Sequence, residues 1–305
     1  MTDFKELKWI AVDWGTSHMR LWLMGEAGTV LDRRHSNKGM NALAPSEFAP
    51  HLREILSDLP ETLNHRTPIV CCGMVGSRQG WVEAPYISVP CAPPSIKQAS
   101  RTEIGSFDVF ILPGIKQLDR PDVMRGEETQ IAGFLAKFNN YTGVICLPGT
   151  HNKWVQINGG LVSRFSTYLS GELFDILSQK SVLKHSLTDG KWDSTSFKNA
   201  VTEVIKNPET FASSLFPLRS ANLLTNADTY SAYSRLSGLI IGSELASARS
   251  YWENKPITII GKNGISKAYT EALEALGNTV EHLNSEAITL RGLKTAYETL
   301  KEPTT

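Results

Sequence analysis

The stretch that decides the fold is Trp9-Ile-Ala-Val-Asp13-Trp-Gly15-Thr16-Ser17-His18-Met-Arg20-Leu-Trp-Leu23. It is typical of an apolar strand that ends in a Gly-Thr turn and is followed by a second strand. The same pattern returns as Val144-Ile-Cys-Leu-Pro-Gly149-Thr150-His151-Asn152-Lys153-Trp154-Val155. In each copy a glycine permits a tight turn, and consecutive backbone N–H groups outside the ladder can point at one spot, which suits an anion such as phosphate. Two such turns facing each other would hold a polyphosphate from both sides.

The bulk composition narrows the classes of function. A chain of 305 residues is long enough for two domains with full cores, so we expect two lobes and a cleft. Lys+Arg and Asp+Glu balance at 31 each, which leaves no basic field for nucleic acid or an anionic membrane. Any anion that the protein binds is therefore bound locally.

The sequence shows no targeting or spanning segment. The N-terminal residues lack the long apolar stretch of a signal peptide, and no later segment approaches the length of a spanning helix, so we expect a cytoplasmic protein. The four cysteines have neither zinc-like spacing nor a disulfide-rich context, and we expect buried free thiols at Cys71, Cys72, Cys91 and Cys146.

Strands and helices are both predicted in each half of the chain, which indicates an α/β fold class. In the first half the strands expected are Ile10–Val12, Leu21–Met24, Ile69–Gly73 and Val109–Pro113, with a helix at Ser46–Ser57. The apolar periodicity fades around Leu118–Arg125, which predicts an N-terminal lobe of residues 1–120 and a C-terminal lobe of residues 121–305. The second half restarts with helix, strand and strand. Its expected elements are helices at Glu128–Phe138, Glu172–Gln179, Ser196–Val204, Ser231–Tyr251, Ser266–Leu276 and Glu286–Leu300, and strands at Val144–Leu147, Trp154–Ile157, Leu161–Phe165 and Ile257–Gly261.

Several segments together resemble a known family. The two Gly-Thr hairpins and a late strand-Gly-helix segment are similar to the phosphate-1, phosphate-2 and adenosine segments of the actin-like ATPase/sugar kinase superfamily. Within it, the chain resembles the 2-keto-3-deoxygalactonate kinase (2-dehydro-3-deoxygalactonokinase) family from about Trp9 to Ala296. The motifs are Asp13-Trp-Gly-Thr-Ser17, Cys72-Gly-Met-Val-Gly-Ser-Arg-Gln-Gly-Trp81 with Glu83-Ala-Pro-Tyr86, Met124-Arg-Gly-Glu-Glu-Thr-Gln130, Leu147-Pro-Gly-Thr-His-Asn-Lys-Trp154 and Ser170-Gly-Glu-Leu-Phe174.

This resemblance implies a fold and an activity. The fold would be a two-lobed actin-like ATPase (ribonuclease H-like) fold, each lobe a mixed sheet flanked by helices, with the active site in the interlobe cleft. The activity would be ATP- and Mg²⁺-dependent phosphorylation of the terminal 6-hydroxyl of 2-dehydro-3-deoxy-D-galactonate, in galactonate catabolism. The expected partners are the sugar acid and ATP, without nucleic acid or membrane, and a homodimer is compatible with the sequence.

Asp13 and the two turns are the candidates for metal and phosphate binding. Asp13 ends an apolar strand directly before the first turn, where a carboxylate could hold Mg²⁺ together with phosphate oxygens, although it could also cap the turn. Backbone and hydroxyl donors for the phosphates would come from Gly15, Thr16, Ser17, Gly149 and Thr150. His151 and Lys153 follow the second turn and could neutralise phosphoryl charge, while Lys153 could instead point to solvent.

Gly126-Glu127 is the candidate for general-base catalysis. In related sugar kinases the second lobe opens with Gly-Asp at the start of a helix, and that Asp removes the proton of the substrate hydroxyl. The matching position here is Glu127, and the next residue, Glu128, is the alternative base. Either carboxylate could simply cap the first turn of the helix.

The remaining candidates concern the sugar acid and the adenosine. Arg78 is the first choice for the substrate carboxylate, because a guanidinium pairs bidentately with a carboxylate, and an interdomain salt bridge is the alternative. Trp14 is a further aromatic candidate, and Ser170-Gly171-Glu172 could reach the cleft or cap a helix. The other substrate candidates are Ser77, Gln79, Trp81, Tyr86 and Arg20, and the adenosine candidates are Gly242 in Gly238–Glu244 and Gly261, Lys262 and Gly264 after the strand Ile257–Ile260.

Two rival functions remain open. The near rival is a kinase for another sugar or sugar acid, since only the first-lobe pocket would differ. The rival from a different class is a nucleotide-switched actin-like regulatory or binding protein, because a fold does not determine a function.

Overall fold

The chain forms two compact units. The computed structural model describes residues 6–59 and 66–301. The first unit comprises Met1–Tyr141, Asn158–Arg164 and Ser285–Thr305, and the second comprises Thr142–Ile157 and Phe165–Asn284. Residues 121–141 therefore pack within the first unit, and the lobes predicted at 1–120 and 121–305 stay a prediction.

A six-stranded mixed sheet forms the centre of the first unit, with strand order β3-β2-β1-β4-β7-β6. β1 pairs antiparallel with β2 and parallel with β4, and β4 pairs parallel with β7. The strands are β1 (Trp9–Trp14), β2 (Met19–Met24), β3 (Val30–Ser36), β4 (Thr67–Gly73), β6 (Ser100–Ile104) and β7 (Phe107–Ile111).

Both faces of this sheet are covered, which explains why β1 is apolar from Trp9 to Val12. Side chains alternate across a strand, so Ile10 and Val12 join the core with Phe48 and Leu52 of helix α1 (Phe48–Ile55). Trp9 and Ala11 lie in the core on the other face, with residues of helix α9 (Ser285–Lys301). The ring of Trp9 stacks on that of Tyr297 in α9 at 4.4 Å.

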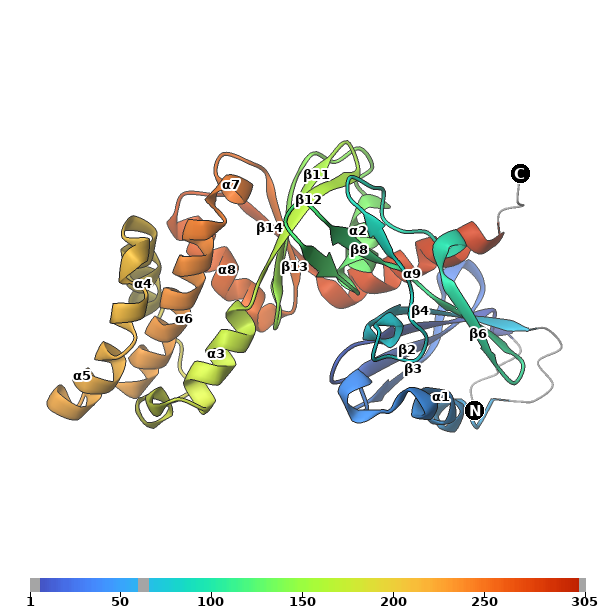
Figure 1. The fold of residues 1–305 in the computed structure, drawn as a ribbon, viewed down its shortest axis with the longest axis horizontal. Helices are drawn as coiled ribbons and strands as arrows, with labels where there is room; N and C mark the ends of the chain where they lie inside the picture. The colour runs from blue at the N-terminus through green and yellow to red at the C-terminus, as the bar shows by residue number, and fades with distance from the viewer. Residues whose placement is uncertain (1–5, 60–65, 302–305) are drawn as a thin grey trace. The chain divides into compact units, whose positions relative to one another are not determined.

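Helix α2 (Glu127–Leu135) packs closely against α9 (Figure 1). A side chain at Gly133 would collide with the backbone of Ile288, and one at Gly292 would collide with the backbone of Thr129. The pair of glycines thus lets the two helix backbones touch. A small sheet with order β5-β8-β9 completes the unit, formed by β5 (Tyr86–Ser88), β8 (Gly114–Gln117) and β9 (Asp122–Met124).

The second unit repeats the hairpin and parallel strand of the first. β10 pairs antiparallel with β11 and parallel with β13, as β1 does with β2 and β4. The sheet order is β12-β11-β10-β13-β14, with strands β10 (Gly143–Leu147), β11 (Asn152–Asn158), β12 (Leu161–Tyr168), β13 (Ile257–Gly261) and β14 (Val280–Asn284). The helices are α3 (Ser170–Gln179), α4 (Ser194–Lys206), α5 (Pro217–Thr225), α6 (Thr229–Ser247), α7 (Arg249–Trp252) and α8 (Asn263–Ala275). α4 and α6 lie side by side (Figure 1).

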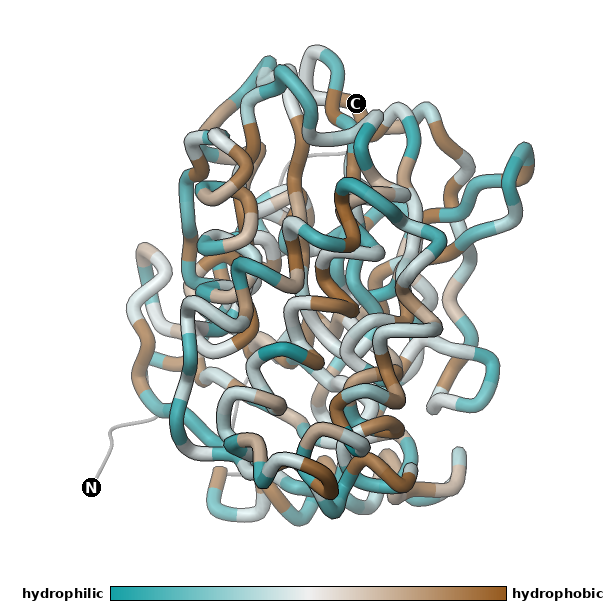
Figure 2. Tube along the Cα trace, turned by 90° about the vertical axis from the view of Figure 1, so that its left-hand side faces the viewer, coloured by the Kyte–Doolittle hydropathy of each residue, from teal (hydrophilic) through white to brown (hydrophobic). Residues whose placement is uncertain are grey.

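The elements expected from the sequence are present in the structure. The tube in Figure 2 shows hydrophobic stretches separated by hydrophilic ones, the pattern from which these elements were predicted. One helix differs, because Ser231–Tyr251 is divided at Ala248 into α6 and α7. All four cysteines are free thiols, and Cys91 is only half-buried whereas the other three are buried. Within residues 6–59 and 66–301, no helix has the length and apolarity that a membrane crossing requires.

Candidate active site

Asp13 lies near the end of β1 with both carboxylate oxygens in contact with neighbours. Its register partner in β2 is Arg20, whose Nε donates to Oδ2 at 3.1 Å and whose Nη2 forms an ion pair with the same oxygen. The Cys72 thiol lies 3.8 Å from Oδ1, and burial raises the pKa of that thiol, so it stays protonated as a donor. Arg20, a predicted substrate residue, also approaches Glu286 of α9 at 3.5 Å. Arg20 is therefore engaged in two ion pairs, and its role in substrate binding stays a prediction.

The first Gly-Thr turn is open on one side and supported on the other. Gly15 N donates to the carbonyl of His18 at 2.9 Å and closes the turn, while Thr16 and Ser17 are exposed. The segment around Gly39 supports the back of the turn, because Gly39 N donates to Ser17 O at 3.2 Å. The hydroxyls of Thr16 and Ser17 are therefore available to a ligand.

Two glycines bring the start of α2 to the end of β1. Gly73 has φ +91° and leaves no room for a side chain beside the carbonyl of Trp14. Gly126 has φ +105°, and a Cβ added there would lie 3.4 Å from the Cα of Gly73. Both are backbone conformations that side chains rarely adopt. Gly126-Glu127 and Asp13-Trp14 thus lie on either side of Gly73, within one unit.

Glu127 and Glu128 differ in environment. Glu127 is half-buried, and its Oε2 accepts from the backbone N–H of Arg125 at 3.0 Å. Glu128 is 2% exposed, and its Oε2 accepts from the N–H of Gly126 at 2.6 Å. Burial, together with the charge of Glu127, raises the pKa of Glu128 from 4.5 to about 8. At neutral pH Glu128 is therefore mostly protonated, and both of its oxygens are engaged, Oε2 by the N–H of Gly126 and Oε1 by the hydroxyl of Thr129 at 3.2 Å.

The raised pKa of Glu128 predicts a pH-dependent stability. Since the folded-state pKa of about 8 exceeds the reference value of 4.5, protonated Glu128 contributes stability fully at low pH, and the contribution is lost as pH rises through 8. The midpoint of thermal unfolding should fall between about pH 5 and about pH 8 and level off above that range, and Glu128→Gln should flatten that dependence. The measurement is thermal unfolding of both proteins across this range. Equal slopes in the two proteins would contradict the prediction.

The predicted substrate segment surrounds a short turn after β4. Arg78 and Gln79 are exposed at its tip, whereas Ser77 is 4% exposed. Trp81 packs against the core around α1, and Tyr86 lies in β5 with its ring 4.2 Å from the guanidinium carbon of Arg125. Trp14 is fully buried against Phe48, so it is a core residue and not a pocket wall. Sequence reasoning quoted Arg125 within a motif and gave it no role.

In the second unit, the Gly149-Thr150 turn is held by the start of α3. Gly149 N donates to Oδ1 of Asn152 at 2.7 Å, and Glu172 N donates to Thr150 O at 3.0 Å. A side chain at Gly171 would collide with the backbone of this turn. His151 Nε2 lies 2.7 Å from Oε2 of Glu172. The motif beginning at Ser170 is thus a support of the second turn.

A buried carboxylate stands behind this turn. Glu244 in α6 is 3% exposed and accepts hydrogen bonds from Asn152 Nδ2 at 2.8 Å, Trp154 Nε1 at 2.7 Å and Tyr269 Oη at 2.7 Å, as well as from Ser170 Oγ. Burial raises the pKa of Glu244, and these four donors oppose the shift. From the sequence, Glu244 was predicted only as the last residue of the adenosine segment Gly238–Glu244 and Asn152 was given no role, although an Asn three residues after a turn glycine is a usual capping signal.

The other predicted site residues of the second unit lie outside the second Gly-Thr turn, each in different surroundings. Lys153 is 4% exposed in β11, so the alternative that it points to solvent is wrong. Gly242 packs against the backbone of Val201 in α4, which accounts for a glycine there. Gly261 ends β13 against the hydroxyl of Ser266, a buried oxygen without a partner among the described residues. Lys262 is exposed before α8, and Gly264 has open space around it. The turn from β13 to α8 therefore has open space only at Gly264, and the nucleotide roles stay predictions.

Comparisons with known proteins first define the class. (R)-2-hydroxyglutaryl-CoA dehydratase component A of Acidaminococcus fermentans matches 96% of this chain and 99% of its own with a TM-score of 0.52 at 11% identity, a likeness that shows the fold alone. Together with the repeated hairpin and parallel strand in two sheets, it makes this a protein of the actin-like ATPase fold, as the sequence predicted.

The family follows from closer matches. A family model described as 2-keto-3-deoxy-galactonokinase matches residues 13–296. The 2-dehydro-3-deoxygalactonokinase of Escherichia coli is 32% identical over 94% of this chain and 96% of its own length. A crystal structure bearing the same enzyme name, from Sinorhizobium meliloti, matches 97% of this chain and all of that chain with a TM-score of 0.89 at 36% identity. The chain belongs to the 2-keto-3-deoxy-galactonokinase family, which confirms the resemblance, and as a sugar acid kinase it uses ATP.

Proposed function

We propose that this protein transfers the γ-phosphoryl group of ATP to the 6-hydroxyl of 2-dehydro-3-deoxy-D-galactonate in the cytoplasm, giving the 6-phosphate of the keto-deoxy acid. Family membership supports the reaction and the substrate. The structural observation that carries the proposal is the placement of Gly126-Glu127 beside Gly73 and Asp13 in one unit, because a kinase needs a base and a phosphate-side carboxylate close together.

The proposed roles follow from the environments of the residues. Glu127 accepts the proton of the 6-hydroxyl as its oxygen attacks phosphorus, since Glu128 is mostly protonated at neutral pH. The backbone and exposed hydroxyls of the Thr16-Ser17 turn, and the Gly149-Thr150 turn, bind phosphate oxygens. Catalysis of this kind depends mainly on positioning and charge stabilisation.

Mg²⁺ fits the donors around Asp13. Among the described residues there is no group of three or more His, Cys, Asp or Glu side chains arranged to hold a metal. Mg²⁺ does not need such a group, because it binds through one or two carboxylates, phosphate oxygens and water. Asp13 would hold the ion with the nucleotide phosphates, and the bound ion would neutralise phosphate charge. Arg20, now paired with Asp13, would then share or release that carboxylate.

A substrate panel tests the proposed function. ADP release is measured with ATP, Mg²⁺ and each of several neutral sugars, aldonates and 2-keto-3-deoxy aldonates. We expect stimulation by 2-dehydro-3-deoxy-D-galactonate at least about tenfold above every neutral sugar. Preference for a neutral sugar would favour a different sugar kinase. ATP turnover that no acceptor stimulates would favour a nucleotide-switched regulatory protein.

A further inference from the structure

Two buried donors in the first unit have no hydrogen-bond partner among the described residues. They are Oγ of Ser77 and Nη1 of Arg125, and these residues are 4% and 8% exposed. Gly76 lies next to both residues, because Ser77 is its chain neighbour and a Cβ on Gly76 would lie 2.8 Å from Nη1 of Arg125. Ser77 thus belongs to the turn after β4, and Nη1 of Arg125 packs against that turn at Gly76.

Arg125 is tied to this place by its other groups. Its Nη2 donates to the carbonyl of Ala84 at 2.7 Å, and its Nε donates to Tyr86 Oη at 3.3 Å. Its guanidinium also lies over the Tyr86 ring. These partners are all uncharged. In the part of the chain that the structure describes, no carboxylate forms an ion pair with this buried guanidinium, although its charge lowers the pKa of the nearby Glu128, against the larger effect of burial.

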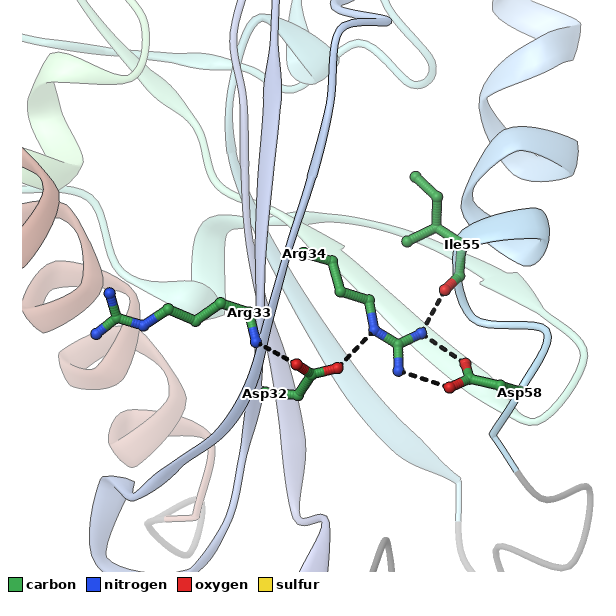
Figure 3. Close-up of polar contacts among 5 residues, drawn as sticks. All are labelled: Asp32, Arg33, Arg34, Ile55 and Asp58. Atoms are coloured by element: carbon green, nitrogen blue, oxygen red, sulfur yellow. Dashed lines mark hydrogen bonds and ion pairs between the residues drawn. The ribbon is translucent and has the colours of Figure 1, made fainter. Parts of the chain in front are cut away.

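Arg34 shows what a purely structural arginine looks like in the same unit (Figure 3). Its guanidinium donates to Asp58 at 2.6 and 3.0 Å, to Asp32 at 3.0 Å, and to the carbonyl of Ile55. Each nitrogen of Arg34 therefore has an acceptor, and two carboxylates balance the charge. Arg125 is more buried in its surroundings yet has an unpaired nitrogen and no carboxylate.

An unpaired charged donor in a protein interior is costly, and a carboxylate is the ligand that would satisfy it best. The sugar acid of the proposed function carries one carboxylate, at the opposite end of the molecule from the hydroxyl to be phosphorylated. A neutral sugar would leave Nη1 of Arg125 and Oγ of Ser77 without acceptors. Such a site discriminates strongly against an analogue that lacks the polar group, because the buried donors of the protein would then have no acceptor.

We propose that Arg125 and Ser77 bind the carboxylate of the sugar acid and make the enzyme select acids over neutral sugars. The site rests on the proposed function and specifies which residues recognise its substrate. The backbone N–H of Arg125 donates to Glu127, so the residue that anchors the acid is also joined to the proposed base. Arg78 and Gln79, at the tip of the same turn, are exposed. Arg78 is then not the main anchor.

The test compares kcat/KM for the acid and for its neutral C1 carboxamide. In the wild-type enzyme the acid should be preferred by about a hundredfold or more, and Arg125→Met should remove most of that preference by impairing the acid alone. Arg125→Lys should restore part of it, and Ser77→Ala should reduce it by about tenfold. Arg34→Met is the matched control, in which the ratio between acid and amide should not change.

The possible results distinguish a failure of the carboxylate site from a failure of the proposed function. An unchanged ratio in folded Arg125→Met and Ser77→Ala would overturn the site, as would a ratio abolished by Arg78→Met instead. Because Ser77→Ala removes only one oxygen atom, it remains informative if Arg125→Met does not fold. A wild-type enzyme that phosphorylates neither compound would contradict the proposed function, whereas a wild-type enzyme active on both equally would contradict only the carboxylate site.

Discussion

Glu127→Gln should lower kcat by at least about a hundredfold while ATP binding changes little. Glutamine keeps an oxygen that can accept from the N–H of Arg125, so the start of α2 should retain its geometry. It cannot take a proton from the substrate hydroxyl. The loss should therefore appear in kcat for phosphoryl transfer, measured as ADP release with saturating acid, and not in the affinity for ATP.

The neighbouring Glu128→Gln variant is the control for this assignment. Glu128 is buried and mostly protonated at neutral pH, so glutamine resembles the form already present. We expect its kcat to stay within about tenfold of the wild-type value. A larger loss in Glu128→Gln than in Glu127→Gln would reverse the assignment of the base.

Glu244→Ala should cause the largest loss of stability. The change leaves four donors without their acceptor in the interior of the second unit, those of Asn152, Trp154, Ser170 and Tyr269. Each buried donor that is left without an acceptor costs roughly 1–3 kcal/mol of unfolding free energy. Because Asn152 also accepts from Gly149 N, the second Gly-Thr turn should be displaced and the KM for ATP should rise.

Two further variants make this second prediction decisive. Glu244→Gln keeps the size of the side chain and should fold if Glu244→Ala does not, with a smaller loss of stability and a raised KM for ATP. Glu203→Ala removes a half-exposed carboxylate of the same unit that pairs with Arg235, and should cost only about 1 kcal/mol or less. Denaturant unfolding and ATP kinetics measure both effects. Equal stability losses in Glu244→Ala and Glu203→Ala would refute a structural role for the network.

The parts of the fold that the sequence predicted are those with strong local patterns. β1 as far as Val12 and β10 from Val144 are continuous apolar runs because both faces of each are buried, and their Gly-Thr turns follow where they end. Of the edge strands, β12 was predicted and β3 and β14 were not. β3 reads Val-Leu-Asp-Arg-Arg-His-Ser and β14 reads Val-Glu-His-Leu-Asn, and neither has enough apolar residues for a sequence signal, since an edge strand is stabilised mainly by pairing with its neighbour.

The motifs of the candidate site could be predicted from the sequence, but the hydrogen-bond partners of its residues could not. Asp13, Glu127 and the two turns stand out because each sits at a strand or helix end. The partners that decide their environments are distant in sequence, as with Glu244, which is 92 residues from Asn152. Arg125 likewise gains its significance from Ala84 and Tyr86, which β5 and the turn before it bring close. Such contacts arise from tertiary packing and leave no local pattern.

The most direct test of the central claim is the position of the phosphate in the product formed from 2-dehydro-3-deoxy-D-galactonate, ATP and Mg²⁺. Phosphorus-proton coupling in the NMR spectrum reports which carbon carries the phosphate ester. The account predicts coupling of one phosphorus to the two protons at C6, with one ADP formed for each ester. Formation of ADP and inorganic phosphate without any phosphorylated acid would contradict it.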